Sequence, residues 1–90
     1  MVWTKWNMLT DGYQFDPPTY KGPACYELGV GGLRTMPKRP AYVGKTGNLN
    51  TRMNRYGSTG SHLKYFFNEA FFNNKKIYYR YISSLGQLNI

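Results

Sequence analysis

Tyrosine, lysine and arginine recur at short spacing between Tyr42 and Tyr56, and these residue types can bind a phosphodiester. Tyr42 ends a short apolar strand candidate, Lys45 lies in the Gly-rich turn that follows, and Arg52 belongs to the next helix. Arg52 and Tyr56 are four residues apart, so their side chains share one helical face. The spacing predicts that a phenol, an ammonium and a guanidinium meet at one corner. A basic strand, turn and helix with a solvated face is the alternative that spacing leaves open.

The positive charge of the chain is concentrated in its middle. Twelve Lys and Arg against four Asp and Glu give a net charge of +8, and residues 28 to 68 contain seven cations and no acid. A field of one sign attracts polyanions, and nucleic acid is the partner this predicts. An anionic membrane is less favoured because no helix shows a basic amphipathic pattern. The candidate nucleic-acid contacts are Arg34, Lys38, Arg39, Arg55 and Lys64.

Several site classes are excluded by composition. Cys25 and His62 are the only cysteine and histidine, whereas structural zinc needs about four such ligands. A single cysteine forms no internal disulfide, which fits a reducing compartment. Neither a signal peptide nor an apolar run of membrane-spanning length is visible. We therefore expect a soluble, cytoplasmic protein.

The predicted fold is a single small α+β domain with a heavily aromatic core. Residues 1–22, with Trp, Tyr and Pro-Pro, predict an irregular N-terminal arm, and the domain proper is expected over 23–90. The predicted elements are strands at 24–30, 41–43 and 76–82 and helices at 48–56 and from Ser61 to about 73. Their β-β-α-α-β order predicts a three-stranded antiparallel sheet flanked by helices.

A set of motifs now gives the chain a family likeness. The segments Ala24-Cys25-Tyr26, Tyr42-Val43-Gly44, Arg52, Tyr56 and Gly60-Ser61-His62-Leu63 together resemble the GIY-YIG nuclease family. The likeness covers about residues 23 to 83. It implies a compact sheet-and-helix domain that cuts a DNA phosphodiester, most often in double-stranded DNA, with one divalent metal, Mg²⁺ or Mn²⁺.

The resemblance also implies roles for individual positions. The implied catalytic residues are Tyr26, Tyr42, Lys45, Arg52, Tyr56 and His62. Either of the first two tyrosines would activate or hold the attacking water, with Tyr26 preferred, and Lys45 would support the phenolate or the phosphate. Arg52 would neutralise charge that develops on the phosphate. Tyr56 and His62 would contact the phosphate or the leaving group.

One departure from the family concerns the metal. The family's metal-binding glutamate comes from a helix after the third strand, and the sequence ends at Ile90 without one, as in a shortened domain. Glu27 adjoins Tyr26 on a strand and should face the other side of the sheet. This leaves Glu69 as the metal candidate, although its place between apolar helix positions suits a solvent residue.

Three functional hypotheses follow. The first is a GIY-YIG DNA endonuclease, weakened by the missing glutamate unless a partner chain supplies a carboxylate. The second is a non-catalytic nucleic-acid binding module that uses the same basic face. The third is a small interaction protein whose charge serves solubility. A phage or mobile element is a setting that would suit the nuclease.

Overall fold

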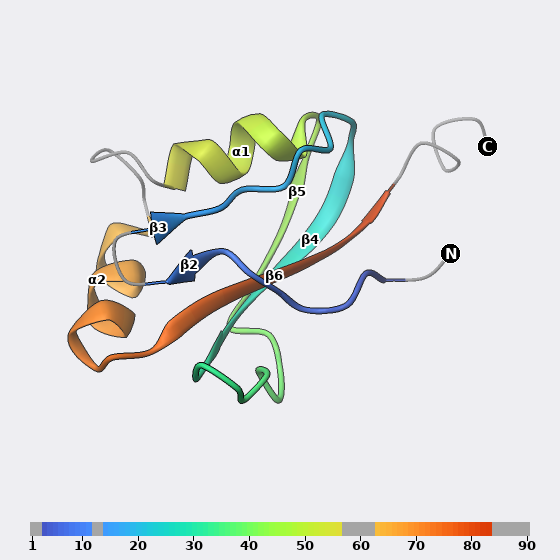
Figure 1. The fold of residues 1–90 in the computed structure, drawn as a ribbon. Coiled ribbons are helices and arrows are strands. Elements are labelled where there is room, and N and C mark those ends of the chain that lie inside the picture. Colours follow the sequence, from blue (N-terminus) through green and yellow to red (C-terminus); the bar gives the residue numbers. More distant parts are fainter. Residues whose placement is uncertain (1–2, 12–13, 57–62, 84–90) are drawn as a thin grey trace.

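The computed structural model describes residues 3–11, 14–56 and 63–83, and these residues form an α+β fold (Figure 1). Its main sheet is antiparallel, with the strand order β1-β6-β4-β5. These strands are β1 (Asn7–Met8), β4 (Ala24–Gly31), β5 (Tyr42–Thr46) and β6 (Lys76–Ser83). The helices are α1 (Leu49–Tyr56) and α2 (Lys64–Phe72), and β2 (Thr10–Asp11) pairs with β3 (Gln14–Phe15). The predicted fold class is confirmed.

Strand β4 lies between β5 and β6 and positions most of the core. Its side chains alternate between two faces, as the period of a strand requires. Ala24, Tyr26 and Leu28 are buried on the face covered by the helices. The partners opposite Tyr26 are Gly44 on β5 and Tyr81 on β6. Tyr26 therefore enters the core from the middle of the sheet.

The sheet has four strands where the sequence predicts three. The additional strand, β1, comes from the segment predicted as an irregular arm, and it pairs with β6. Backbone hydrogen bonds from Thr4 N–H to Tyr81 C=O (2.9 Å) and from Leu9 N–H to Ile77 C=O (2.7 Å) extend this pairing. A strand of two residues shows no alternating pattern, so it could be found only through its partner.

The segment between β1 and β4 also holds α1 in place. The N–H groups of Leu49 and Asn50 donate to the carbonyls of Gly22 and Tyr20, at 3.1 and 2.9 Å. The Asn48 side chain accepts from Thr51 N–H at 3.0 Å, which is an N-cap contact. The first turn of α1 is thus satisfied from within the chain, and its orientation on the sheet is fixed.

Both helices lie on one side of the sheet (Figure 1). Helix α1 buries Leu49, Met53 and Tyr56, as its predicted period requires. Helix α2 buries Phe67 and Ala70 and begins at Lys64, later than predicted. The predicted cap, Ser61, lies outside the described residues. Within the described part of the chain, neither helix has the length and apolar character needed to cross a bilayer.

Candidate functional site

Two buried phenols meet between the sheet and α1. The hydroxyl groups of Tyr26 and Tyr56 are 2.5 Å apart, and each can donate to the other. Their rings lie edge to face, with centroids 6.4 Å apart. Tyr26 is fully buried and Tyr56 nearly so. The structure thus brings the tyrosine of the first triplet against the tyrosine of α1.

Tyr42 and Arg52 complete the group at its more exposed side. The rings of Tyr42 and Tyr26 have centroids 6.2 Å apart, and Tyr42 is only partly buried. Gly44, opposite Tyr26, leaves room for the ring, because a Cβ there would overlap it. Arg52, also partly buried, lies near enough to act electrostatically on both buried phenols. We name Tyr26, Tyr42, Arg52 and Tyr56 the phenol–arginine cluster.

The buried phenols of the cluster are neutral. Burial is the largest cause and raises the pKa of Tyr26 and of Tyr56 above the ordinary value. The hydrogen bond to Tyr56 and the charge of Arg52 oppose the rise of the Tyr26 pKa without cancelling it. Neither of these two phenols has the lowered pKa that a tyrosine acting as a general base would need. At neutral pH they act through hydrogen bonds.

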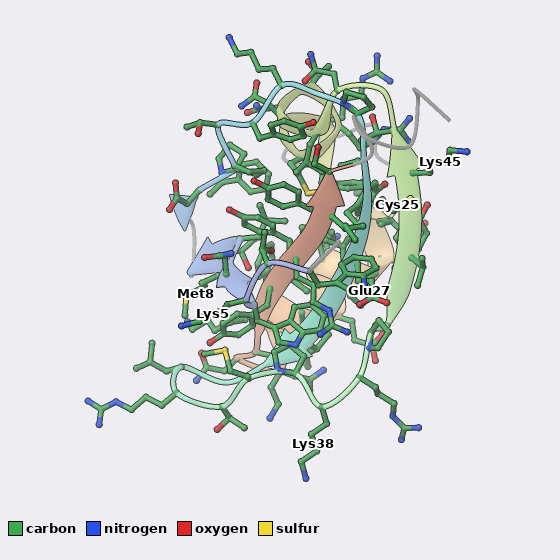
Figure 2. All side chains as sticks on the ribbon, turned by 90° about the vertical axis from the view of Figure 1, so that its right-hand side faces the viewer. Lys5, Met8, Cys25, Glu27, Lys38 and Lys45 are labelled. Atoms are coloured by element: carbon green, nitrogen blue, oxygen red, sulfur yellow. The ribbon has the colours of Figure 1, made fainter. Side chains whose placement is uncertain are left out.

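Lys45 does not join the cluster, so its predicted place at the corner is wrong. The residue belongs to strand β5 and pairs with Cys25, one position after Gly44 faces Tyr26. Since successive side chains of a strand alternate, Lys45 lies on the opposite sheet face from Tyr42. Figure 2 shows Lys45 extending outward from β5. A Gly-rich stretch resembles a turn in sequence, but here it continues the strand.

The acidic residues do not provide a metal site within the described residues. Glu27 lies on the face opposite Tyr26, as predicted, and accepts from Arg80 Nε at 2.6 Å. Glu69 is exposed on α2 and lines a cavity with Val30 and Lys75. No group of three or more His, Cys, Asp or Glu side chains in the described part of the chain is placed to hold a metal. These residues therefore do not fit Mg²⁺ or Mn²⁺ by themselves.

The predicted nucleic-acid contacts are distributed over three elements. Arg34, Lys38 and Arg39 lie exposed in the loop between β4 and β5. Arg55 is exposed on α1 and Lys64 is exposed at the start of α2. His62 lies outside the described residues. Their roles in binding stay predictions.

Sequence reasoning passed over one cation beside these. Lys75, just after α2, lines a cavity together with Lys38 and Arg39. Its neighbours in sequence, Asn73-Asn74, indicate only a helix end. Only the packing of α2 against the sheet brings it to the loop between β4 and β5, and no local pattern reports that contact.

Comparison with known families agrees with this geometry. The model of a GIY-YIG domain-containing protein matches residues 10–86. The chain belongs to the GIY-YIG family. No curated protein and no solved structure matches it. Membership makes this a nuclease-type domain directed at DNA, and the tyrosines and arginine of the GIY-YIG motifs are the ones that the fold gathers.

Proposed function

We propose that this GIY-YIG domain binds a DNA phosphodiester at the phenol–arginine cluster and hydrolyses it in the presence of Mg²⁺ or Mn²⁺. The observation that carries the proposal is the convergence of Tyr26, Tyr42, Arg52 and Tyr56 from β4, β5 and α1. A guanidinium is suited to a phosphate because it is always charged and can donate two parallel hydrogen bonds. The substrate class is duplex DNA.

The different burial of the three phenols suggests a different role in the reaction for each. Tyr42 is partly exposed, so its hydroxyl can contact the phosphate or the attacking water. Tyr26 and Tyr56 lie behind it and act as positioning residues, since their hydroxyls are bonded to each other. Arg52 stabilises the negative charge that grows on the phosphate oxygens as water adds and the P–O bond breaks. This assignment moves the water-contacting role from Tyr26, which the resemblance favours, to Tyr42.

Binding without cleavage is the second candidate, and a specific observation favours it. The two glutamates among the described residues, Glu27 and Glu69, are respectively paired with Arg80 on the opposite face and exposed beside Lys75. A domain that lacks its carboxylate would keep the phosphate site and lose most of the activity. A carboxylate supplied by a second chain would restore the first candidate.

Plasmid nicking separates the two candidates. Purified protein is incubated with supercoiled plasmid and Mg²⁺ or Mn²⁺, and the nicked form is measured over time. We expect the wild type to nick and Arg52→Ala to do so about 100-fold more slowly, since a charge-stabilising donor is lost. Lys5→Ala removes one exposed cation just before β1, the edge strand opposite β5, and should leave the rate unchanged. A duplex RNA of the same sequence tests the preference for DNA.

Two results would count against hydrolysis. Salt-sensitive DNA binding without nicking in either metal supports the binding module. Nicking by Arg52→Ala at the wild-type rate would show that the cleaving site lies elsewhere.

A further inference from the structure

A cationic cavity lies at the end of β4, where the loop to β5 begins. Its volume is about 520 Å³, and its charged lining residues are Lys38, Arg39 and Lys75. The rest of the lining comes from residues 30–41, and none of it is acidic. The cavity thus combines three positive charges with no negative one.

The loop that carries two of these cations is anchored. Pro37 is buried and packs against Gly29, where a Cβ would overlap it. The Tyr78 hydroxyl donates to the Gly32 carbonyl at 2.5 Å, and Gly32 N–H donates to the Thr35 carbonyl at 2.9 Å. These contacts fold the loop onto the sheet. Lys38 and Arg39 therefore leave a backbone whose position is fixed.

Lys75 comes to the cavity from another element. It follows α2, and its N–H donates to the Ala70 carbonyl at 2.8 Å after Asn74 takes a left-handed conformation (φ 56°). Neither Lys75 nor the two loop cations form an ion pair with an acidic side chain in the described residues. Glu69 lines the neighbouring cavity without pairing with Lys75. Cations gathered without partners repel one another, and a bound anion relieves that repulsion.

One residue that lines the cavity, Val30, lies on the same face of β4 as Tyr26. Val30 is four residues beyond Tyr26 on β4, which corresponds to about 13 Å along a strand. Tyr42, the cluster residue that pairs with Leu28, is two residues nearer to the cavity along the sheet than Tyr26 is. One DNA strand can pass from the cluster to the cavity within a few nucleotides.

We propose that Lys38, Arg39 and Lys75 form a second phosphate-binding site, which takes a backbone phosphate of the strand held at the phenol–arginine cluster. The proposal rests on the proposed function for the identity of the ligand as DNA. The second site fixes the direction in which the DNA strand crosses the sheet, because the two phosphate sites lie at different positions along β4. Lys75 is the residue that closes the site from the helix side.

Equilibrium binding in EDTA tests the second site without requiring cleavage. Fluorescence anisotropy of a labelled 20-base-pair duplex, about two turns of DNA, is measured with the full chain over a series of KCl concentrations. Neutralising one phosphate contributes about −0.9 to the slope of log K against log salt, so Lys75→Ala should make the slope shallower by about one. Lys75→Arg should keep the wild-type slope. Lys5→Ala, which makes the same charge change before β1 at a residue that does not line the cavity, should also keep it.

The outcomes separate this inference from the proposed function. If Lys75→Ala is the only variant with a shallower slope of log K against log salt, the second site is supported, even if the protein nicks no plasmid with either metal. Equal slopes for Lys75→Ala and the wild type, or equal losses for Lys75→Ala and Lys5→Ala, would overturn it even where the plasmid is cut. Circular dichroism melts of the variants verify that each folds.

Discussion

Neighbouring residues of β4 supply the two faces of the sheet with different polar groups. Tyr26 faces the helices, where neutral phenols bond to one another and Arg52 stays partly exposed beside them. Glu27 faces the other way and is paired with Arg80, whose guanidinium lies 4.5 Å from the Trp6 ring centroid and 5.5 Å from that of Trp3. On the face with the phenols, Arg52 remains available to a ligand. On the other face, Arg80 is engaged by Glu27 and the two indole rings. Charge alone therefore does not mark a site.

The difference between the two faces of the sheet also explains the role of the N-terminal segment. Trp3 and Trp6 come from the chain before β1, and their stacking on Arg80 fastens that chain over the sheet. Trp6 also approaches Gly29, where Pro37 packs. The face with the closed ion pair thus supports the loop between β4 and β5, while the other face carries the phenol–arginine cluster, where we propose that the substrate binds. The predictions below change one face at a time.

The largest expected effect on stability comes from Gly44→Ala. The new Cβ overlaps the Tyr26 ring, so the strand or the ring must move. Overpacking of this kind costs about 1–3 kcal/mol of unfolding free energy. Urea unfolding followed by circular dichroism measures the loss, and DNA binding should weaken with it. Gly47→Ala is the matched control, since a Cβ there meets nothing within 4 Å, and it should change stability by less than about 0.5 kcal/mol. A Gly44→Ala variant as stable as Gly47→Ala would contradict the packing described.

A smaller effect is expected from Glu27→Ala on the opposite face. Removing the carboxylate leaves Arg80 partly buried without its charged acceptor, at a cost of about 1–2 kcal/mol after allowance for exposure. Tryptophan fluorescence should change as well, because Arg80 lies against both indoles. Affinity for DNA should not fall. Glu69→Ala, an exposed control, should alter neither stability nor fluorescence. A loss of DNA binding for Glu27→Ala but not for Glu69→Ala would place the DNA on the face of Glu27 and Arg80, opposite the phenol–arginine cluster.

The smallest effect is a dependence of stability on alkaline pH. An unfolded tyrosine ionises near pH 10, whereas the pKa of Tyr26 and that of Tyr56 are raised by burial. The unfolded state therefore loses protons first, and the stability contributed by the neutral phenols is present below pH 10 and lost as the pH rises above it. Urea midpoints between about pH 8 and 11 record the fall. Tyr26→Phe should reduce this slope, and the exposed Tyr65→Phe should leave it as in the wild type. The slope will not vanish, because burial also raises the pKa of Tyr79.

Sequence reasoning succeeded where a local period decided the outcome. The strand predicted at 76–82 is β6 (Lys76–Ser83), and the four-residue spacing correctly placed Arg52 beside Tyr56. The family motifs singled out Tyr26 and Tyr56, and the structure adds the contact between their hydroxyl groups.

Sequence reasoning failed where a contact with a residue distant in the sequence decided the structure. Gly44 and Lys45 belong to β5 because β4 pairs with them, although the glycines suggest a turn. Strand β1 forms because it pairs with the edge of β6 that β4 leaves open. Lys75 reaches the loop between β4 and β5 only through the packing of α2. In each case the deciding residue lies more than ten positions away, and neither propensity nor spacing records it.

A titration followed by ¹⁵N–¹H NMR tests most directly the claim that the helix-covered face of the sheet receives the phosphodiester. The full chain is titrated with a short DNA duplex in EDTA, and backbone amide shifts are measured. The account predicts the largest changes at Tyr42 and Arg52, with smaller ones at Lys75 and none at Trp6 or Arg80. Largest changes at Trp6 and Arg80, with Tyr42 and Arg52 unmoved, would contradict it.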